Sequence, residues 1–215
     1  MKEPQDPAQA CVIWMHGLGA DAADMMGLAD QLPVSSTPVR HVFIDAPSRP
    51  VTLNGGMVMP AWYDIMGMEL VDREDKAGIE KSRILITQVM NTQLEDGFKS
   101  EQIFLAGFSQ GGAMAIHTAL HFEGKLGGVI ALSAYIPLAS QTDAVLDKST
   151  PFFIGSGQYD PLVLPIWTQQ SHQWLKAQGY QHLSIHLYSM EHSICYEEVR
   201  DVSEWLNQQV QGVSQ

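Results

Sequence analysis

Three residues of this chain, Ser109, Asp160 and His192, are of the types that together perform nucleophilic catalysis. Ser109 stands at the centre of the sequence G-F-S-Q-G, after an apolar run at residues 103–106 and before a helical pattern at residues 113–120. A G-x-S-x-G between a strand and a helix is typical of a nucleophile elbow, a tight turn that projects the serine hydroxyl out of the sheet. The same five-residue pattern also fits a glycine-rich turn with an ordinary serine at a helix start. The rest of the chain must therefore decide between a catalytic and a structural serine.

Asp160 and His192 each follow a later apolar segment, at residues 152–155 and 182–188. The chain order Ser, Asp, His is that of α/β hydrolases. A serine hydroxyl is a poor nucleophile without a base, and His192 would take its proton and return it to the leaving group. Asp160 would orient the imidazole and stabilise its charged form. We therefore predict a catalytic triad of Ser109, Asp160 and His192.

The elements that position these residues alternate between strands and helices. Strands are expected at residues 11–15, 39–44, 103–106, 128–133, 152–155 and 182–188, and helices at 22–32, 79–94, 113–120, 165–178 and from after His192 to about 207. Such alternation predicts one α/β domain over residues 1–215, with a mostly parallel sheet and helices on both of its faces. In such sheets the site lies at the carboxyl ends of the strands.

The end of the first strand, His16-Gly17-Leu18-Gly19, offers a second part of a catalytic site. The backbone amide of Leu18 and that of Gln110 are expected to meet over one oxygen and to stabilise a tetrahedral oxyanion. Gln110 would act through its backbone, so replacing its side chain should cost little.

A rival interpretation from another class uses the same glycines. G-x-G-x-x-A at residues 17–22 after a strand, with Asp45 after the next strand, matches a dinucleotide-binding fingerprint. That interpretation leaves Ser109, Asp160 and His192 unexplained, so no nucleotide and no other cofactor is expected.

Residues 51–77 form a long stretch without a clear period, and stretches of this length in compact domains are usually functional. Its methionines and aromatic residues fit a lining for an apolar substrate, although they would equally fit a plug at the edge of the core. We place Gly17, Met57, Met59 and Trp62 around the substrate.

Two histidines, His117 and His121, share one face of the helix after Ser109. This spacing suits a metal, but the glutamate of an H-E-x-x-H motif is missing, so no metal site is expected. The two cysteines, Cys11 and Cys195, match no metal spacing and are expected to be free thiols.

The net charge of the chain excludes one class of binding partner. The chain of 215 residues has 24 acidic and 12 basic residues and a net charge of −12, which argues against nucleic acid as a partner. No apolar run has the length of a membrane span, and the N-terminus has no apolar core of a signal peptide, so a cytoplasmic location is expected.

Five segments together resemble the phospholipase/carboxylesterase family, which includes acyl-protein thioesterases and bacterial carboxylesterases. They are H-G-L-G-A-D from His16, A-P-S-R-P-V-T from Ala46, W-Y-D-I from Trp62, G-F-S-Q-G-G from Gly107 and M-E-H-S from Met190. The resemblance spans residues 11–206. It implies an α/β hydrolase without a large cap domain, the same triad and oxyanion amides, and residues 51–68 beside the acyl group.

Members of this family cleave short- to medium-chain carboxylic esters, and some cleave thioesters or lysophospholipids. The resemblance therefore implies a serine carboxylesterase acting on small or lipid-like acyl esters through an acyl-enzyme. It also implies a homodimer. Transient membrane contact is a separate possibility to test, since a loop can dock on lipid without a basic patch. The alternative from another class is a non-catalytic protein that binds an apolar ligand on the same fold.

Overall fold

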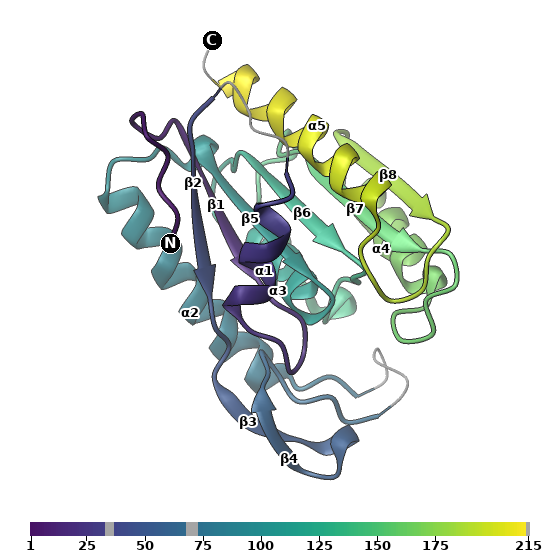
Figure 1. Ribbon diagram of the computed structural model, residues 1–215. Helices are drawn as coiled ribbons and strands as arrows, with labels where there is room; N and C mark the ends of the chain where they lie inside the picture. Colours follow the sequence, from purple (N-terminus) through teal and green to yellow (C-terminus); the bar gives the residue numbers. More distant parts are fainter. Residues whose placement is uncertain (33–36, 68–72, 214–215) are drawn as a thin grey trace.

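The computed structural model describes residues 1–32, 37–67 and 73–213. Six parallel strands form its central sheet (Figure 1). In spatial order they are β2 (Val39–Ile44), β1 (Ala10–Met15), β5 (Ile103–Phe108), β6 (Gly128–Leu132), β7 (Phe152–Gly157) and β8 (Leu183–Tyr188). The four inner strands are continuous apolar runs that are almost completely buried, as expected of a parallel sheet covered on both faces.

Helices cover the two faces of the sheet in separate groups. α1 (Ala22–Ala29) and α5 (Tyr196–Val213) pack on one face, and α2 (Lys76–Glu95), α3 (Gln110–Leu120) and α4 (Pro165–Ala177) pack on the other (Figure 1). The side chains of β1 alternate between the two resulting cores. Ile13 and Met15 join the core under α2 and α3, and Val12 and Trp14 join the core under α1 and α5.

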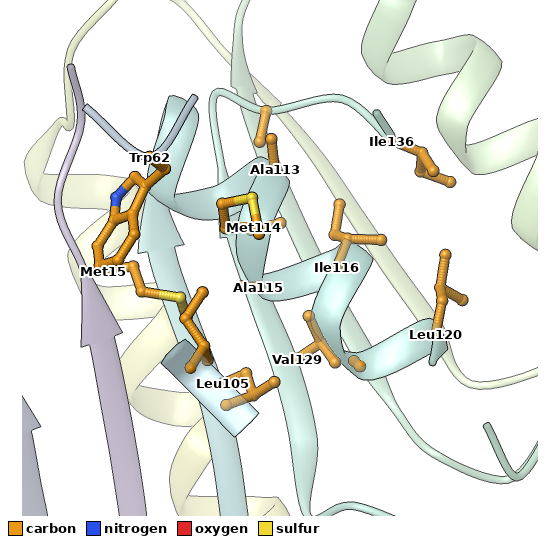
Figure 2. Close-up of a cluster of buried hydrophobic side chains, with 14 of the residues drawn as sticks. Met15, Trp62, Leu105, Ala113, Met114, Ala115, Ile116, Leu120, Val129 and Ile136 are labelled. Carbon is orange, nitrogen blue, oxygen red and sulfur yellow. The ribbon is translucent and has the colours of Figure 1, made fainter. Parts of the chain in front are cut away.

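The helix α3 lies deepest, because every one of its residues is buried. Met114 and Ile116 of α3 form one cluster with Met15, Leu105 and Val129 of the sheet (Figure 2). Each such aliphatic side chain contributes roughly 1.5–3 kcal/mol by leaving water. The start of α3, where Ser109 stands, is therefore fixed against the sheet.

The structure corrects the sequence prediction within residues 51–77. Part of this stretch is a hairpin of β3 (Ser48–Val51) and β4 (Met57–Pro60), joined by a 3₁₀ turn at Thr52–Asn54. Gly55 and Gly56 take positive φ angles at its tip. The strands are only four residues long and contain prolines, so they lack the alternation that predicts a strand. Met68 lies outside the described residues.

The last helix is also longer than predicted, because α5 continues to Val213 instead of ending near residue 207. Val210 is buried and extends the apolar face of this helix by another turn. Among the described residues, no helix combines the length and the apolar character needed to cross a membrane.

The sheet topology decides where a site forms. From β1 the chain moves first to β2 on one side and later to β5 on the other side, so the strand order reverses between β1 and β5. Loops that leave the carboxyl ends of neighbouring strands at such a point bound a crevice. The segments predicted to carry the chemistry follow β1, β5, β7 and β8 at this edge.

Candidate active site

Ser109 occupies a strained turn between β5 and α3. Its φ of 54° and ψ of −121° place a residue with a Cβ in a sparsely populated conformation. The residues two positions before and after Ser109 must be glycines. A Cβ on Gly107 would lie 2.4 Å from the backbone of Gly111, and a Cβ on Gly111 would lie 2.1 Å from the carbonyl oxygen of Met15. The G-x-S-x-G spacing thus reflects backbone contacts that leave no room for a side chain.

A chain of hydrogen bonds joins the three predicted catalytic residues. The Ser109 hydroxyl donates to His192 Nε2 at 2.9 Å, and His192 Nδ1 donates to Asp160 Oδ2 at 2.7 Å. The imidazole also lies against the ring of Phe108, with 4.8 Å between ring centroids. The structure therefore brings together three residues that are up to 83 positions apart in the sequence.

Both oxygens of the buried Asp160 carboxylate accept hydrogen bonds. Its Oδ1 accepts hydrogen bonds from the backbone amides of Leu162 and Val163, at 2.8 and 2.9 Å, which leaves Oδ2 for His192. The turn after β7 thus fixes the carboxylate on the side of the imidazole that faces away from Ser109.

The loop after β1 carries the predicted oxyanion amide of Leu18. In the part of the chain that the structure describes, this amide makes no hydrogen bond, whereas the amides of Gly19 and Ala20 bond to Pro60 and Gly17. Helix α3 begins at Gln110, whose amide has no partner in its own helix. Leu18 and Gln110 line the same cavity as Ser109 and His192, so both donors stand at the site.

The buried residue His16 holds this loop in place. Its Nε2 accepts a hydrogen bond from the amide of Ala46 at 3.0 Å, and its Nδ1 donates to the carbonyl of Gly17 at 2.7 Å. Its own carbonyl accepts the indole N–H of Trp62 at 2.9 Å. In the sequence, His16 stands out only as the start of a motif. In the structure, its side chain and its carbonyl hold three separate segments together.

The Gln110 side chain has a second role that the sequence analysis missed. It is buried, its Oε1 accepts the amide of Trp62 at 2.7 Å, and its Nε2 donates to the carbonyl of Tyr63 at 2.8 Å. The expectation that Gln110 acts only through its backbone is therefore too simple. Its side chain fixes the segment that carries Tyr63 beside the site.

An apolar cavity of about 290 Å³ opens at Ser109 and His192. Of the residues predicted around the substrate, only Gly17 lines it. Trp62 is buried behind the wall, and Met57 on the hairpin has 64% of its surface exposed. Met59 is half-buried near Gly19. The walls are otherwise formed by Leu18, Ala20, Leu53, Tyr63, Ile65, Phe108, Tyr135, Pro161, Leu162 and Val163.

Two buried tyrosines form part of this wall. The hydroxyls of Tyr63 and Tyr135 lie 3.2 Å apart and hydrogen-bond to each other. Burial raises the pKa of both phenols well above the ordinary value, so both stay neutral. Sequence signals for these residues existed, because Tyr63 adjoins Trp62 and Tyr135 follows the end of β6.

The dinucleotide interpretation of the first loop does not fit the structure. Asp45, proposed to bind a ribose, accepts the amide of Ala22 at 2.7 Å. Asp21 caps the same helix by accepting the amides of Ala23 and Asp24. The first amides of α1, which would have to face a pyrophosphate, are thus already paired.

The sheet order, the strained serine turn and the loops at the carboxyl edge define an α/β hydrolase. The model of the phospholipase/carboxylesterase family matches residues 1–210, and the chain belongs to this family. This membership identifies it as an ester-hydrolysing enzyme. The resemblance seen in the sequence is thereby confirmed.

Individual relatives agree with this assignment. Acyl-protein thioesterase 1 of Emericella nidulans is 34% identical over 213 residues, covering 92% of this chain and 89% of the relative. The crystal structure of Zea mays acyl-protein thioesterase 2 superimposes with a TM-score of 0.84 at 26% identity, covering 96% of each chain. That of Arabidopsis thaliana SOBER1 gives a TM-score of 0.85 at 26% identity, covering 94% of this chain and 99% of that one.

Proposed function

We propose that the chain is a serine carboxylesterase that hydrolyses short- to medium-chain acyl esters through an acyl-enzyme. The observation that carries the proposal is the hydrogen-bonded series Ser109–His192–Asp160 at the mouth of an apolar cavity. The nucleophile lies within hydrogen-bond distance of the base, and the base lies within hydrogen-bond distance of the orienting carboxylate, as acyl transfer requires. The reaction uses no cofactor.

In the first half of the reaction, Ser109 Oγ attacks the carbonyl carbon of the ester while His192 Nε2 takes the hydroxyl proton. The carbonyl oxygen becomes an oxyanion and accepts hydrogen bonds from the amides of Leu18 and Gln110. Asp160 keeps Nδ1–H of the imidazole directed at itself and stabilises the imidazolium. The intermediate then collapses, and His192 Nε2–H gives its proton to the departing alcohol.

In the second half, water attacks the acyl-Ser109 ester and gives its proton to His192 Nε2. The same two amides hold the second oxyanion, and its collapse releases the acid and restores the serine hydroxyl. Each residue thus has the same role in both halves, with His192 alternating between base and acid.

The size and the lining of the cavity support the proposal that the acyl chain is short or medium in length. Its volume of about 290 Å³ lies just below the range of small-molecule pockets, roughly 300–1,000 Å³. Apolar side chains such as Leu18, Ile65 and Val163 line it, and the two tyrosine hydroxyls satisfy each other. The cavity therefore suits a short or medium alkyl chain better than a polar acyl group.

Thioesters are the second substrate class to consider. The Emericella nidulans and Zea mays relatives are named acyl-protein thioesterases, which favours an acylated thiol as a substrate here as well. The mechanism is the same, with a thiol leaving in place of an alcohol. Lysophospholipids would also fit this chemistry, so the relative kcat/KM values for the three classes decide the main activity.

The deciding experiment is hydrolysis of p-nitrophenyl esters, from acetate to long chains, by the wild type and by Ser109→Ala. We expect a maximum at a short or medium chain and no turnover by the variant. A fluorophosphonate probe should label the wild type but not Ser109→Ala. A folded wild type that neither turns over any ester nor reacts with the probe would favour the apolar-ligand-binding alternative.

The cytoplasmic location, the homodimer and the transient membrane contact remain predictions. Exposed apolar side chains support the last two, since Leu53, Met57 and Val58 on the hairpin and Leu162 beside the cavity are each at least 43% exposed. Light scattering would measure the oligomeric state, and sedimentation with neutral vesicles would measure membrane contact.

A further inference from the structure

A cluster of metal-ligand side chains lies outside the catalytic site, between α2 and α3. His117 lies in the last turn of α3, His121 directly follows the end of that helix, and Glu80 approaches them from α2. One ligand atom from each of the three residues lies within 4.8 Å of the other two. The carboxylate that the sequence lacked beside the histidines is thus supplied by another helix.

Each ligand is already oriented by a second partner. His121 Nδ1 donates to the carbonyl of His117 at 2.8 Å, which leaves its Nε2 free to bind a cation. Arg83 donates to Glu80 Oε2 at 2.9 Å, and Glu80 Oε1 faces His117 Nε2 at 3.0 Å. Metal-binding histidines and carboxylates in proteins are typically held by such outer hydrogen bonds.

One nitrogen of the buried His117 ring, Nδ1, lacks a hydrogen bond of standard geometry. When its Nε2 carries a proton and donates to Glu80, its Nδ1 has no hydrogen-bond partner of standard geometry, although the ring interacts with the carbonyl of Pro137. A cation on Nε2 would move the proton to Nδ1, where that carbonyl can accept it. Binding would therefore satisfy a polar atom of a side chain that is only 1% exposed.

We propose that His117 Nε2, His121 Nε2 and Glu80 Oε1 bind a Zn²⁺ ion, with the fourth position open to water. Two imidazoles and a carboxylate are an established zinc ligand set, at about 2.0–2.2 Å from the ion. Tetrahedral ligands at that distance lie roughly 3.3 Å apart, so the half-buried side chains of Glu80 and His121 must close around the ion.

The ion would act as a clamp between α2 and α3 and would take no part in ester hydrolysis. His117 stands eight positions after Ser109 on a single helix, which is about 12 Å along its axis. A ligand that binds only the folded chain raises its stability by mass action. Zn²⁺ should therefore raise the thermal midpoint of unfolding in a concentration-dependent way.

Titration calorimetry of the EDTA-treated and dialysed protein with ZnCl₂ tests the proposal. We expect one saturable site in the wild type, weakened at least about 100-fold in His121→Ala and in Glu80→Gln. Both replaced side chains are half-buried, and the second replacement preserves the size of the side chain and one acceptor oxygen. The matched control is His182→Ala, which removes an exposed histidine that lies before β8.

Two outcomes would overturn the proposal. One is the absence of saturable zinc binding by the folded wild type. The other is equal affinity in the wild type, His121→Ala and Glu80→Gln, which would place any bound ion elsewhere, for example at His192. A thermal midpoint that rises with Zn²⁺ in the wild type and in His182→Ala, but not in the two ligand variants, would support it.

Discussion

The two halves of the site are built in different ways. At the serine turn, backbone atoms contact backbone atoms, and a single added Cβ at Gly111 would approach the Met15 carbonyl to 2.1 Å. At the wall of the cavity beside Ser109, side chains from separate loops meet, among them Leu53, Tyr63 and Leu162. The first half is specified within a few residues of sequence, and the second is specified only once distant loops have packed together.

This difference explains which amino-acid substitutions each half of the site tolerates. Close backbone packing has almost no freedom to relax, so a change there alters the geometry of the whole site. A wall of side chains can be reshaped by one methyl group at a time, which changes the preferred substrate and leaves the chemistry in place. The following substitutions test this contrast, from the largest expected effect to the smallest.

Asp160→Asn should cause the largest loss that leaves the fold intact. The amide would still accept from Leu162 and Val163, but it would no longer impose the correct imidazole tautomer or stabilise its charge. By analogy with serine proteases, kcat should fall about 10⁴-fold. The release of p-nitrophenol from p-nitrophenyl esters would measure kcat, and circular dichroism would show whether the variant is folded. A fall of less than tenfold would remove Asp160 from the triad.

Gly111→Ala should damage both the fold and the rate. The new methyl group would collide with the backbone of Met15 and His16, at the start of the loop that carries Leu18. We expect a loss of about 3 kcal/mol in the free energy of unfolding, at the upper end of overpacking effects. Urea denaturation followed by tryptophan fluorescence would measure it.

The matched control is Gly27→Ala in α1, where an added Cβ meets no atom within 4 Å. Because alanine favours a helix interior over glycine, this variant should be as stable as the wild type or gain up to about 1 kcal/mol. Similar losses in Gly111→Ala and Gly27→Ala would contradict the claim that the serine turn is fixed by backbone contact.

The same contrast separates what the sequence predicts from what it does not. The order of strands and helices follows from apolar runs, and the positions of Ser109, Asp160 and His192 follow from strand ends, because both signals are local. The hairpin of β3 and β4 and the composition of the cavity wall cannot be predicted from such local signals. Trp62 was expected to border the substrate, yet its neighbour Tyr63 does so, because the direction of a side chain in a loop depends on tertiary hydrogen bonds such as those of Gln110.

Gln110→Ala tests the link between the two halves. The substitution keeps the backbone amide but leaves the Trp62 amide and the Tyr63 carbonyl without their partner. Unsatisfied buried groups cost about 1–3 kcal/mol each, so we expect lower stability and a larger KM together with a modest loss in kcat. Gln110→Glu retains an acceptor for Trp62 but turns a buried carboxylate oxygen toward the Tyr63 carbonyl, so it should destabilise the fold at least as much as Gln110→Ala.

A role through the backbone amide alone would give a different result. The variants would then have wild-type stability and an unchanged preference among acyl chain lengths. If the preference among acyl chain lengths changes in these variants, the Gln110 side chain positions the cavity wall, in addition to the proposed role of its backbone amide as a donor to the oxyanion.

The smallest expected effect is a shift in acyl preference on trimming the wall. Leu162→Ala would enlarge the cavity beside Ser109, so the optimal p-nitrophenyl ester should become longer, with kcat/KM changing about tenfold between neighbouring substrates. Met57→Ala is the matched control, because Met57 is exposed on the hairpin and does not line the cavity. Its profile should equal that of the wild type. An equal shift in both variants would mean that the hairpin folds over the bound acyl chain, and the sequence-based placement of Met57 would then hold for the substrate complex.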